Sequence, residues 1–260
     1  MSIMNTIKLH AAEYLWKLPK ATFTDPQAAD LSKQLVENGC CVIENFMSPE
    51  QVDTLVANAE RAYQQFPDRV SLESNGADQR IYAVDHLDKS FLLTEELAVA
   101  DRINAAFDRG SNKTWFQMIG KITYKEGNLG SGSGWHRDSP FTHQFKAILY
   151  LTDVTEENGP FEYIKGTHRK DSLKETAKFL GIETSQYRFS PDQIERLEAS
   201  GIVPKRTTVT GKKGTLLMAD VRGLHWGKPL RSGQRMAITR YFFPNGVPAH
   251  FSKLYPQAVL

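Results

Sequence analysis

Apolar residues in the first hundred positions recur mainly at helical spacing. Asp25 followed by a proline is typical of a helix start, and the apolar stripe behind it ends at Gly39. A capping-box sequence at Ser48 predicts a second helix, whose stripe continues to Tyr63. A third helix is expected at about 94–107. This part of the chain is therefore predicted to be mainly helical, with little strand.

The pattern changes near Thr114 to short aromatic and β-branched segments separated by glycine-marked turns. Residues 170–202 interrupt these segments with a further helix start at Ser190, which indicates an insertion between strands. Short, closely spaced strands are typical of a double-stranded β-helix, the cupin-like jelly roll, so the predicted fold is mainly β with flanking helices. The predicted strands are 40–43, 115–124, 145–151, 161–164, 206–210, 215–219 and 236–243.

The length of the chain favours one domain spanning residues 1–260. Within it, 1–113 is expected to form an N-terminal arm and a mainly helical support, with 1–24 as an arm or edge strand. Residues 114–250 are expected to form the jelly-roll core. The long connections at 65–90 and 170–202 are expected to act as lids that select the substrate, because irregular segments over a rigid mouth commonly do so.

Charge and cysteine content restrict the partners and the compartment. The net charge of +2 gives no broad electrostatic reason to expect a nucleic acid or a membrane as partner, which leaves a small molecule. Cys40 and Cys41 are adjacent, a spacing that strains an intrachain disulfide, so a reducing cytoplasm fits best. No apolar segment reaches the length of a membrane span. The sequence does not predict an oligomeric state.

Three residues form a candidate metal site. His136 and Asp138 lie two apart after a glycine-rich turn, so on an extended segment their side chains point to the same side. His225 follows 89 residues later, between two glycines, and a distant strand can bring it to the same mouth of a jelly roll. Two imidazoles and one carboxylate on one face of an octahedron suit iron(II), because the opposite face stays open for a co-substrate and dioxygen.

Arg235 opens the last predicted strand and is a candidate for holding that co-substrate. Strand alternation places it on the same face as Thr239 and Tyr241, with Arg240 on the other face. A guanidinium at a barrel mouth can bind a carboxylate bidentately, as the far end of an oxo-acid co-substrate would require. Arg231 and Arg240 are interpreted as surface charges or sheet-edge partners.

These segments resemble the phytanoyl-CoA dioxygenase family of iron(II)- and 2-oxoglutarate-dependent oxygenases. The resemblance rests on Trp135-His136-Arg137-Asp138, on the segment from Asn158 to His168, and on the spacing from His225 to Arg235. It covers about 115–243. The segment ending in Gly166-Thr167-His168 is similar to a structural turn of the family, so His168 is not expected to be a ligand.

The resemblance implies a role for each site residue and for the cofactors. His136, Asp138 and His225 would be the ligands of Fe(II), and Arg235 would bind the distal carboxylate of 2-oxoglutarate, with O2 as the second co-substrate. Gln117 stands where relatives have a polar contact to the co-substrate. Related halogenases have a small residue in place of the carboxylate, so Asp138 favours hydroxylation.

The proposed activity is thus hydroxylation of a small molecule with release of succinate and CO2. Three alternatives stay open. One is a jelly-roll binding module without turnover. Another is an oxygenase of the same family with a different outcome, namely desaturation, cyclisation or epimerisation. The last is a hydrolase that uses another metal, against which Arg235 argues.

Several residues around the candidate site have two interpretations. Trp135 and Trp226 flank the histidines, where they either wall a pocket or pack in the core. A group of cations would give the mouth a positive charge suited to an anionic substrate, although solvated surface charge is the simpler interpretation. This group consists of Arg137, Lys146, Lys165 and Arg169.

Overall fold

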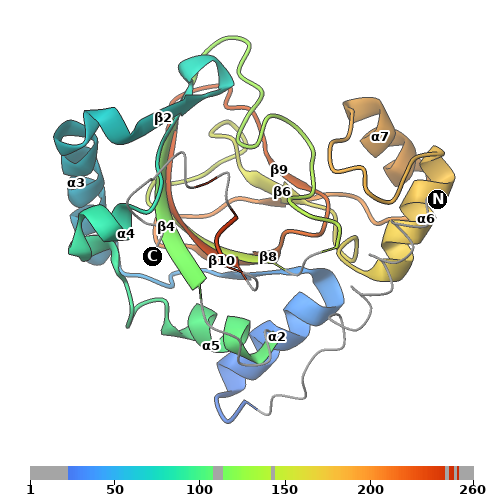
Figure 1. The fold of residues 1–260 in the computed structure, drawn as a ribbon, viewed down its shortest axis with the longest axis horizontal. Helices are drawn as coiled ribbons and strands as arrows, with labels where there is room; N and C mark the ends of the chain where they lie inside the picture. Colours follow the sequence, from blue (N-terminus) through green and yellow to red (C-terminus); the bar gives the residue numbers. More distant parts are fainter. Residues whose placement is uncertain (1–22, 108–113, 142–143, 244–245, 249–250, 252–260) are drawn as a thin grey trace.

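The computed structural model describes residues 23–107, 114–141, 144–243, 246–248 and 251. The arm or edge strand expected at 1–24 lies almost entirely outside these residues. Two antiparallel sheets form the centre of the fold (Figure 1). None of the described helices combines the length and the apolar character that crossing a membrane requires.

Seven strands form the larger sheet, in the order β1-β8-β5-β10-β4-β3-β2. Three strands form the smaller sheet, in the order β7-β6-β9. The two sheets build the predicted jelly roll. The strands of the larger sheet are β1 (Cys40–Ile43), β2 (Val70–Glu73), β3 (Asp78–Ile81), β4 (Thr114–Thr123), β5 (Phe145–Tyr150), β8 (Leu216–Asp220) and β10 (Gln234–Phe243). Those of the smaller sheet are β6 (Phe161–Tyr163), β7 (Thr207–Val209) and β9 (His225–Gly227).

Three helices begin at the caps that the sequence signals indicate, whereas α6 begins without a side-chain cap and was not expected. Asp25 caps the first helix through its side chain and Gly39 ends it in the left-handed conformation, while Ser48 and Gln51 form the expected capping box. Ser190 caps the last helix in the same way. The described helices are α2 (Pro26–Asn38), α3 (Pro49–Gln65), α4 (Val84–Leu87), α5 (Ala98–Phe107), α6 (Lys170–Leu180) and α7 (Pro191–Ser200), with 3-10 turns at Pro67–Arg69, Ser74–Gly76 and Lys89–Phe91.

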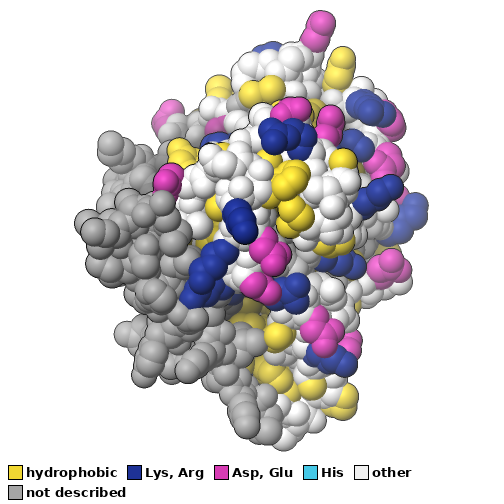
Figure 2. Space-filling model, turned by 90° about the vertical axis from the view of Figure 1, so that its right-hand side faces the viewer, with side chains coloured by type: hydrophobic (Ala, Val, Ile, Leu, Met, Phe, Trp, Pro, Cys, Tyr) yellow, Lys and Arg dark blue, Asp and Glu magenta, His cyan; other side chains and the backbone are white. Residues whose placement is uncertain are grey.

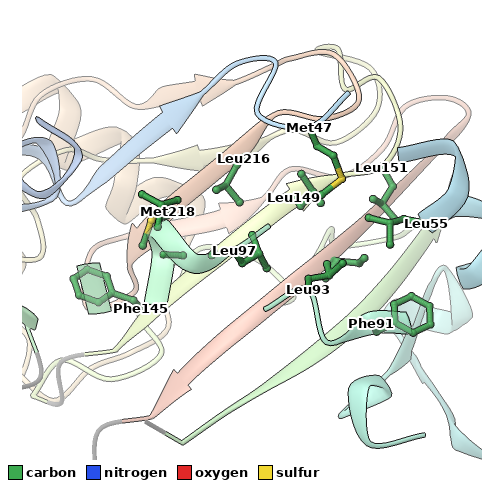
Figure 3. Close-up of a cluster of buried hydrophobic side chains, with 14 of the residues drawn as sticks. Met47, Leu55, Phe91, Leu93, Leu97, Phe145, Leu149, Leu151, Leu216 and Met218 are labelled. Atoms are coloured by element: carbon green, nitrogen blue, oxygen red, sulfur yellow. The ribbon is translucent and has the colours of Figure 1, made fainter. Parts of the chain in front are cut away.

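Helices cover the two sheets on opposite sides. In Figure 1, α2, α3, α4 and α5 lie outside the larger sheet, and α6 and α7 lie beyond the smaller one. Side chains from α2, α3 and α5 pack against one face of the larger sheet in the main hydrophobic core. Figure 3 shows part of this core, in which Leu149, Leu216 and Met218 meet Leu55 and Leu97. The opposite face of the larger sheet is thereby free to line a cavity between the sheets.

The connection at 65–90 departs from expectation because it contains two strands of the main sheet. β2 and β3 pair with each other, and β3 continues the sheet beyond β4. Together with β1, they place three strands of the larger sheet before residue 114, in the part expected to be mainly helical. The inward side chains of β3 are Asp78 and Arg80, which are buried as an ion pair rather than apolar. No hydrophobic alternation therefore marks this strand in the sequence.

Arg240 also departs from expectation. Its side chain is completely buried, with the guanidinium paired to Asp101 of α5 at 2.9 Å and stacked over Trp115. It also donates hydrogen bonds to the carbonyls of Leu92 and Leu93. Arg240 thus attaches α5 and the preceding loop to the outer face of the sheet and is not a surface charge. Arg231, by contrast, is exposed beside Glu157, as expected.

Truncating a side chain on one face of β5 should destabilise the protein more than truncating one on the other face. Leu149→Ala removes a fully buried side chain from the helix-covered core and should lower the free energy of unfolding by about 2–5 kcal/mol. Ile148→Ala removes a half-buried side chain from the cavity wall and should cost less. Urea denaturation of both variants measures the difference. Equal losses would contradict the assignment of the two faces.

Candidate metal centre and co-substrate site

A pair of backbone hydrogen bonds joins the two candidate histidines. The amide of His136 donates to the carbonyl of His225, and the amide of His225 donates to that of His136, both at 3.0 Å. β9, which contains His225, is held in turn by β6, where Tyr163 stands opposite His225. The amide of Asp138 donates to the carbonyl of Val221 at 3.0 Å. The chain thus brings together all three predicted metal ligands.

The three candidate donor atoms converge on one point. The Nε2 atoms of His136 and His225 lie 3.3 and 3.6 Å from Oδ1 of Asp138. One ligand atom from each residue lies within 4.8 Å of the other two. Donors about 2.1 Å from a divalent ion at right angles to each other would be about 3.0 Å apart. The two distances to Asp138 are slightly wider than this value, and small side-chain movements would bring the donors to it.

The hydrogen bond at Nδ1 of each imidazole determines which of its two nitrogens carries the proton. Nδ1 of His136 lies 2.8 Å from the carbonyl of Gly134, and Nδ1 of His225 lies 2.9 Å from the carbonyl of Gly223. A carbonyl only accepts, so Nδ1 carries the proton in both rings and Nε2 keeps its lone pair. This is the tautomer that a metal ligand requires.

Burial and charge favour the ionisation states that bind a cation. Burial and the neighbouring His136 lower the pKa of His225 to about 4, so its imidazole is neutral at pH 7. Burial by itself raises the pKa of Asp138, but the ammonium of Lys146 and the neighbouring His136 and His225 together outweigh burial and hold that pKa well below its usual range. Nε2 of His225 is buried with no hydrogen-bond partner. Two lone pairs and a carboxylate directed at one another need a cation between them, so the residues fit a metal ion.

Gly132 allows this approach. Its φ is +81°, and a Cβ at this position would overlap the ring of His136. The glycine-serine run therefore has a steric function next to the first histidine as well as a turn-forming one.

Arg235 lines the cavity from β10, on the face of Thr239 and Tyr241 that strand alternation predicts. Its guanidinium is buried and donates to the carbonyl of Gly159. Burial lowers the pKa of Arg235. Among the residues that the structure describes, no carboxylate lies within ion-pair distance of this guanidinium. Its charge is therefore left for a ligand.

Gln117 is not brought to this site. Its side chain is completely buried on the other face of β4, where the amide nitrogen donates to the carbonyls of Phe91 and Leu92. In the antiparallel register Gln117 stands opposite Arg240, which also points away from the cavity. The co-substrate contact expected for Gln117 is thus corrected to a structural one: it attaches the loop before α5 to the sheet.

The cavity between the sheets has a volume of about 870 Å³ and includes polar residues that the sequence did not indicate. Arg80 pairs with Asp78 at 2.5 Å and with Glu73 at 3.1 Å, and it donates to Ser131 at 2.9 Å. From the insertion, Tyr187 and Arg188 also line the cavity. Lys146, one of the cations that the sequence places at the mouth, lines the cavity. No sequence signal marks Arg80 or Arg188.

The insertion reaches the cavity through backbone pairing. The amide of Arg137 donates to the carbonyl of Tyr187 at 2.8 Å, and the amide of Phe189 donates to that of Trp135 at 3.0 Å. The segment 187–189 therefore runs beside 135–137, with Arg188 next to His136. This placement fits the expectation that residues 170–202 contribute to substrate selection.

Other residues near the site serve packing. Trp135 and Trp226 stack at 5.3 Å between ring centroids, and neither lines the cavity. Arg137 is completely buried and donates to the carbonyls of Thr167 and Arg222 at 2.5 Å. Arg137 is therefore no solvated surface charge: it connects the first ligand segment to the turn and to the loop before His225.

His168, in that turn, contacts the carbonyl of Val36 through Nε2 at 3.1 Å, which agrees with a structural role. The remaining two cations of the predicted group differ in exposure. Lys165 is half-buried and Arg169 is exposed. Neither lines the cavity.

Comparison with known proteins agrees with this geometry. The family model described as phytanoyl-CoA dioxygenase (PhyH) matches residues 35–237. The chain belongs to the phytanoyl-CoA dioxygenase family. Like other members of its class, it is an iron(II)- and 2-oxoglutarate-dependent dioxygenase. The predictions of family, fold, enzyme class and cofactors are thereby confirmed.

Two sequence relatives of this dioxygenase are about a quarter identical to it over the aligned residues. Ectoine dioxygenase of Bordetella bronchiseptica is 24% identical over 223 residues, covering 78% of this chain and 70% of the relative. L-proline trans-4-hydroxylase of Streptomyces griseoviridis is 26% identical over 150 residues, covering 50% and 55%. The crystal structure of the epimerase SnoN with Fe3+, alpha-ketoglutarate and nogalamycin RO has a TM-score of 0.63, 14% identity and coverage of 84% of each chain. That likeness shows the shared fold.

Substitution of Gln117 separates its structural role from a role in co-substrate binding. Gln117→Leu removes a donor from the buried carbonyls of Phe91 and Leu92, of which only Leu92 keeps another donor within the described chain, Arg240. The substitution should therefore cost about 1–3 kcal/mol of stability. The dissociation constant of 2-oxoglutarate should stay within twofold of the wild-type value, measured by anaerobic titration. Arg235→Leu is the matched control, because it should abolish that binding. A large loss of 2-oxoglutarate affinity in folded Gln117→Leu would restore the original expectation.

Proposed function

We propose that this dioxygenase hydroxylates a small molecule that carries an anionic group, with His136, Asp138 and His225 as the iron ligands. The convergence of two imidazole Nε2 lone pairs on Oδ1 of Asp138 carries the proposal. Bound iron(II) would supply the chemistry that activates dioxygen at the expense of 2-oxoglutarate. The chain itself would hold the ligands, orient both substrates and exclude water.

Arg235 supports the assignment of 2-oxoglutarate to the inner part of the cavity. It stands ten residues after His225 on a neighbouring wall, buried and without a carboxylate partner among the described residues. A planar guanidinium binds a carboxylate through two parallel hydrogen bonds, which would align the distal end of the co-substrate. This placement also argues against a metal hydrolase, which has no need for such a residue.

The primary substrate is proposed to be anionic because Arg188, at the cavity wall, has no carboxylate partner among the described residues. Arg80 is neutralised by Asp78 and Glu73, and Lys146 is paired with Asp138. Arg188, in contrast, donates only to the carbonyls of Gly132 and Ser133, and within the described chain no carboxylate pairs with it. Arg188 is exposed, and its backbone pairs with that of His136. A carboxylate or phosphate held there would lie next to the proposed metal.

The relatives and the surface both support a small substrate. The two sequence relatives are named for reactions on ectoine and proline. On the face shown in Figure 2, Lys and Arg side chains alternate with Asp and Glu, and that face presents no single positive patch of the kind a nucleic acid requires. A reducing cytoplasm is proposed as the location, since Cys40 and Cys41 are both buried free thiols.

Anaerobic titration tests the metal and co-substrate assignment. Fe(II) and 2-oxoglutarate added together to the metal-free protein should produce a charge-transfer band in the visible range, because the oxo-acid chelates the ion. Asp138→Ala should lose hydroxylation, while succinate release by the wild type on a substrate panel excludes a mere binding module. Absence of the band in the wild type, or full activity of Asp138→Ala, would contradict the ligand set. Product analysis distinguishes hydroxylation from desaturation, cyclisation or epimerisation.

Substitution of Arg188 tests the anionic substrate. Arg188→Gln should raise KM for the primary substrate about 10- to 100-fold, the usual effect of losing a charge-assisted hydrogen bond, with 2-oxoglutarate affinity unchanged. The readout is substrate-stimulated succinate formation with amino-acid derivatives, acyl thioesters and sugar or nucleotide compounds. Arg196→Gln, an exposed arginine of α7 paired with Asp192, is the matched control. An equal loss for neutral and anionic compounds would argue against a role in charge recognition.

A further inference from the structure

The second oxygen of the Asp138 carboxylate is already bound within the chain. Oδ1 faces the two histidines, whereas Oδ2 lies 2.5 Å from Nζ of Lys146. Only one of the two oxygens is therefore free to approach an ion between the histidines.

Neighbouring strands on both sides hold the backbone of Lys146. β5 is an inner strand, in which Lys146 stands opposite Ala219 of β8 and Tyr241 of β10. Its Nζ also lies 4.8 Å from the centroid of the Tyr241 ring, so that an aromatic face supports the ammonium on the side of β10. The side chain is only 12% exposed. Water therefore competes little for its hydrogen bonds.

We infer that Lys146 is a positioning residue that keeps Asp138 a one-oxygen ligand of the metal. This inference rests on the proposed ligand set. A carboxylate free to rotate can chelate a divalent ion through both oxygens, which would use one of the positions that 2-oxoglutarate and dioxygen need. Lys146 prevents this by holding Oδ2, and it orients Oδ1 toward the histidines. Groups that orient metal ligands in this way typically contribute 10- to 100-fold to metal affinity.

The pairing argues against Lys146 as a substrate anchor. Lys146 lines the cavity, but its charge is taken up by Asp138. A role in substrate binding and a role in positioning therefore give different results when Lys146 is replaced.

Cobalt(II) binding to the metal-free protein tests the inference without turnover. Three variants separate the charge of the side chain from its hydrogen-bond donor. Lys146→Arg keeps both, Lys146→Gln keeps only a donor, and Lys146→Met keeps neither. We expect Co(II) affinity to fall about 10- to 100-fold in Lys146→Met, less in Lys146→Gln, and to stay within about threefold in Lys146→Arg. The visible absorption of bound Co(II), which reports coordination number, should change in Lys146→Met and stay like the wild type in Lys146→Arg.

Controls separate the possible failures. Ile148→Val changes a side chain on the same strand face and should leave Co(II) affinity and spectrum unaltered. If Lys146→Met does not fold by circular dichroism, the comparison of Lys146→Gln with Lys146→Arg decides. Unchanged affinity and spectrum in the folded variants, with only the KM of the primary substrate raised, would overturn the inference. Failure of the wild-type protein to bind Co(II) would instead overturn the proposed ligand set.

Discussion

The site depends on two reciprocal backbone hydrogen bonds between His136 and His225. Residues 89 positions apart are paired there as one rung of an antiparallel ladder, which places their rings on the same side with centroids 4.3 Å apart. The rung is held on one side by β6 through β9 and on the other by residues 187–189. Because neighbouring segments fix both backbones, the donor atoms are positioned before any ion binds. The protein therefore bears the cost of ordering its ligands during folding rather than during binding.

Local signals in the sequence were sufficient for most of the elements and for the pair of His136 and Asp138. The caps at Asp25, Ser48 and Ser190 satisfy amide groups within a few residues, so their effect is readable without knowledge of the fold. His136 and Asp138 are only two residues apart, so the common direction of their side chains is also readable from the sequence. Nothing local marks β3, because its buried side chains are Asp78 and Arg80, which satisfy each other as an ion pair. Burial of paired charges is a tertiary property, and a pattern based on hydrophobicity does not register it.

Gln117 illustrates a second limit, that of register. Alternation along one strand correctly separated Arg235 from Arg240, but it does not relate one strand to the next. Once β4 and β10 are aligned, Gln117 faces Arg240, and both side chains serve the same loop through the carbonyl of Leu92. Residues directly opposite each other in an antiparallel pair share a face, so the burial of Arg240 implies the position of Gln117. The register was the missing information.

The cations that line the cavity differ in whether a carboxylate already neutralises them. This difference is the basis for the roles proposed for them. Arg80 has two carboxylates, Lys146 has one, and Arg188 and Arg235 donate only to backbone carbonyls. A carbonyl oxygen neutralises no charge. Arg188 and Arg235 can therefore each bind an anion without giving up an ion pair. They lie on different elements, β10 and the insertion. The proposed co-substrate site thus lies on β10 of the sheet. The proposed substrate contact lies on the insertion, whose sequence can change without disturbing the metal ligands.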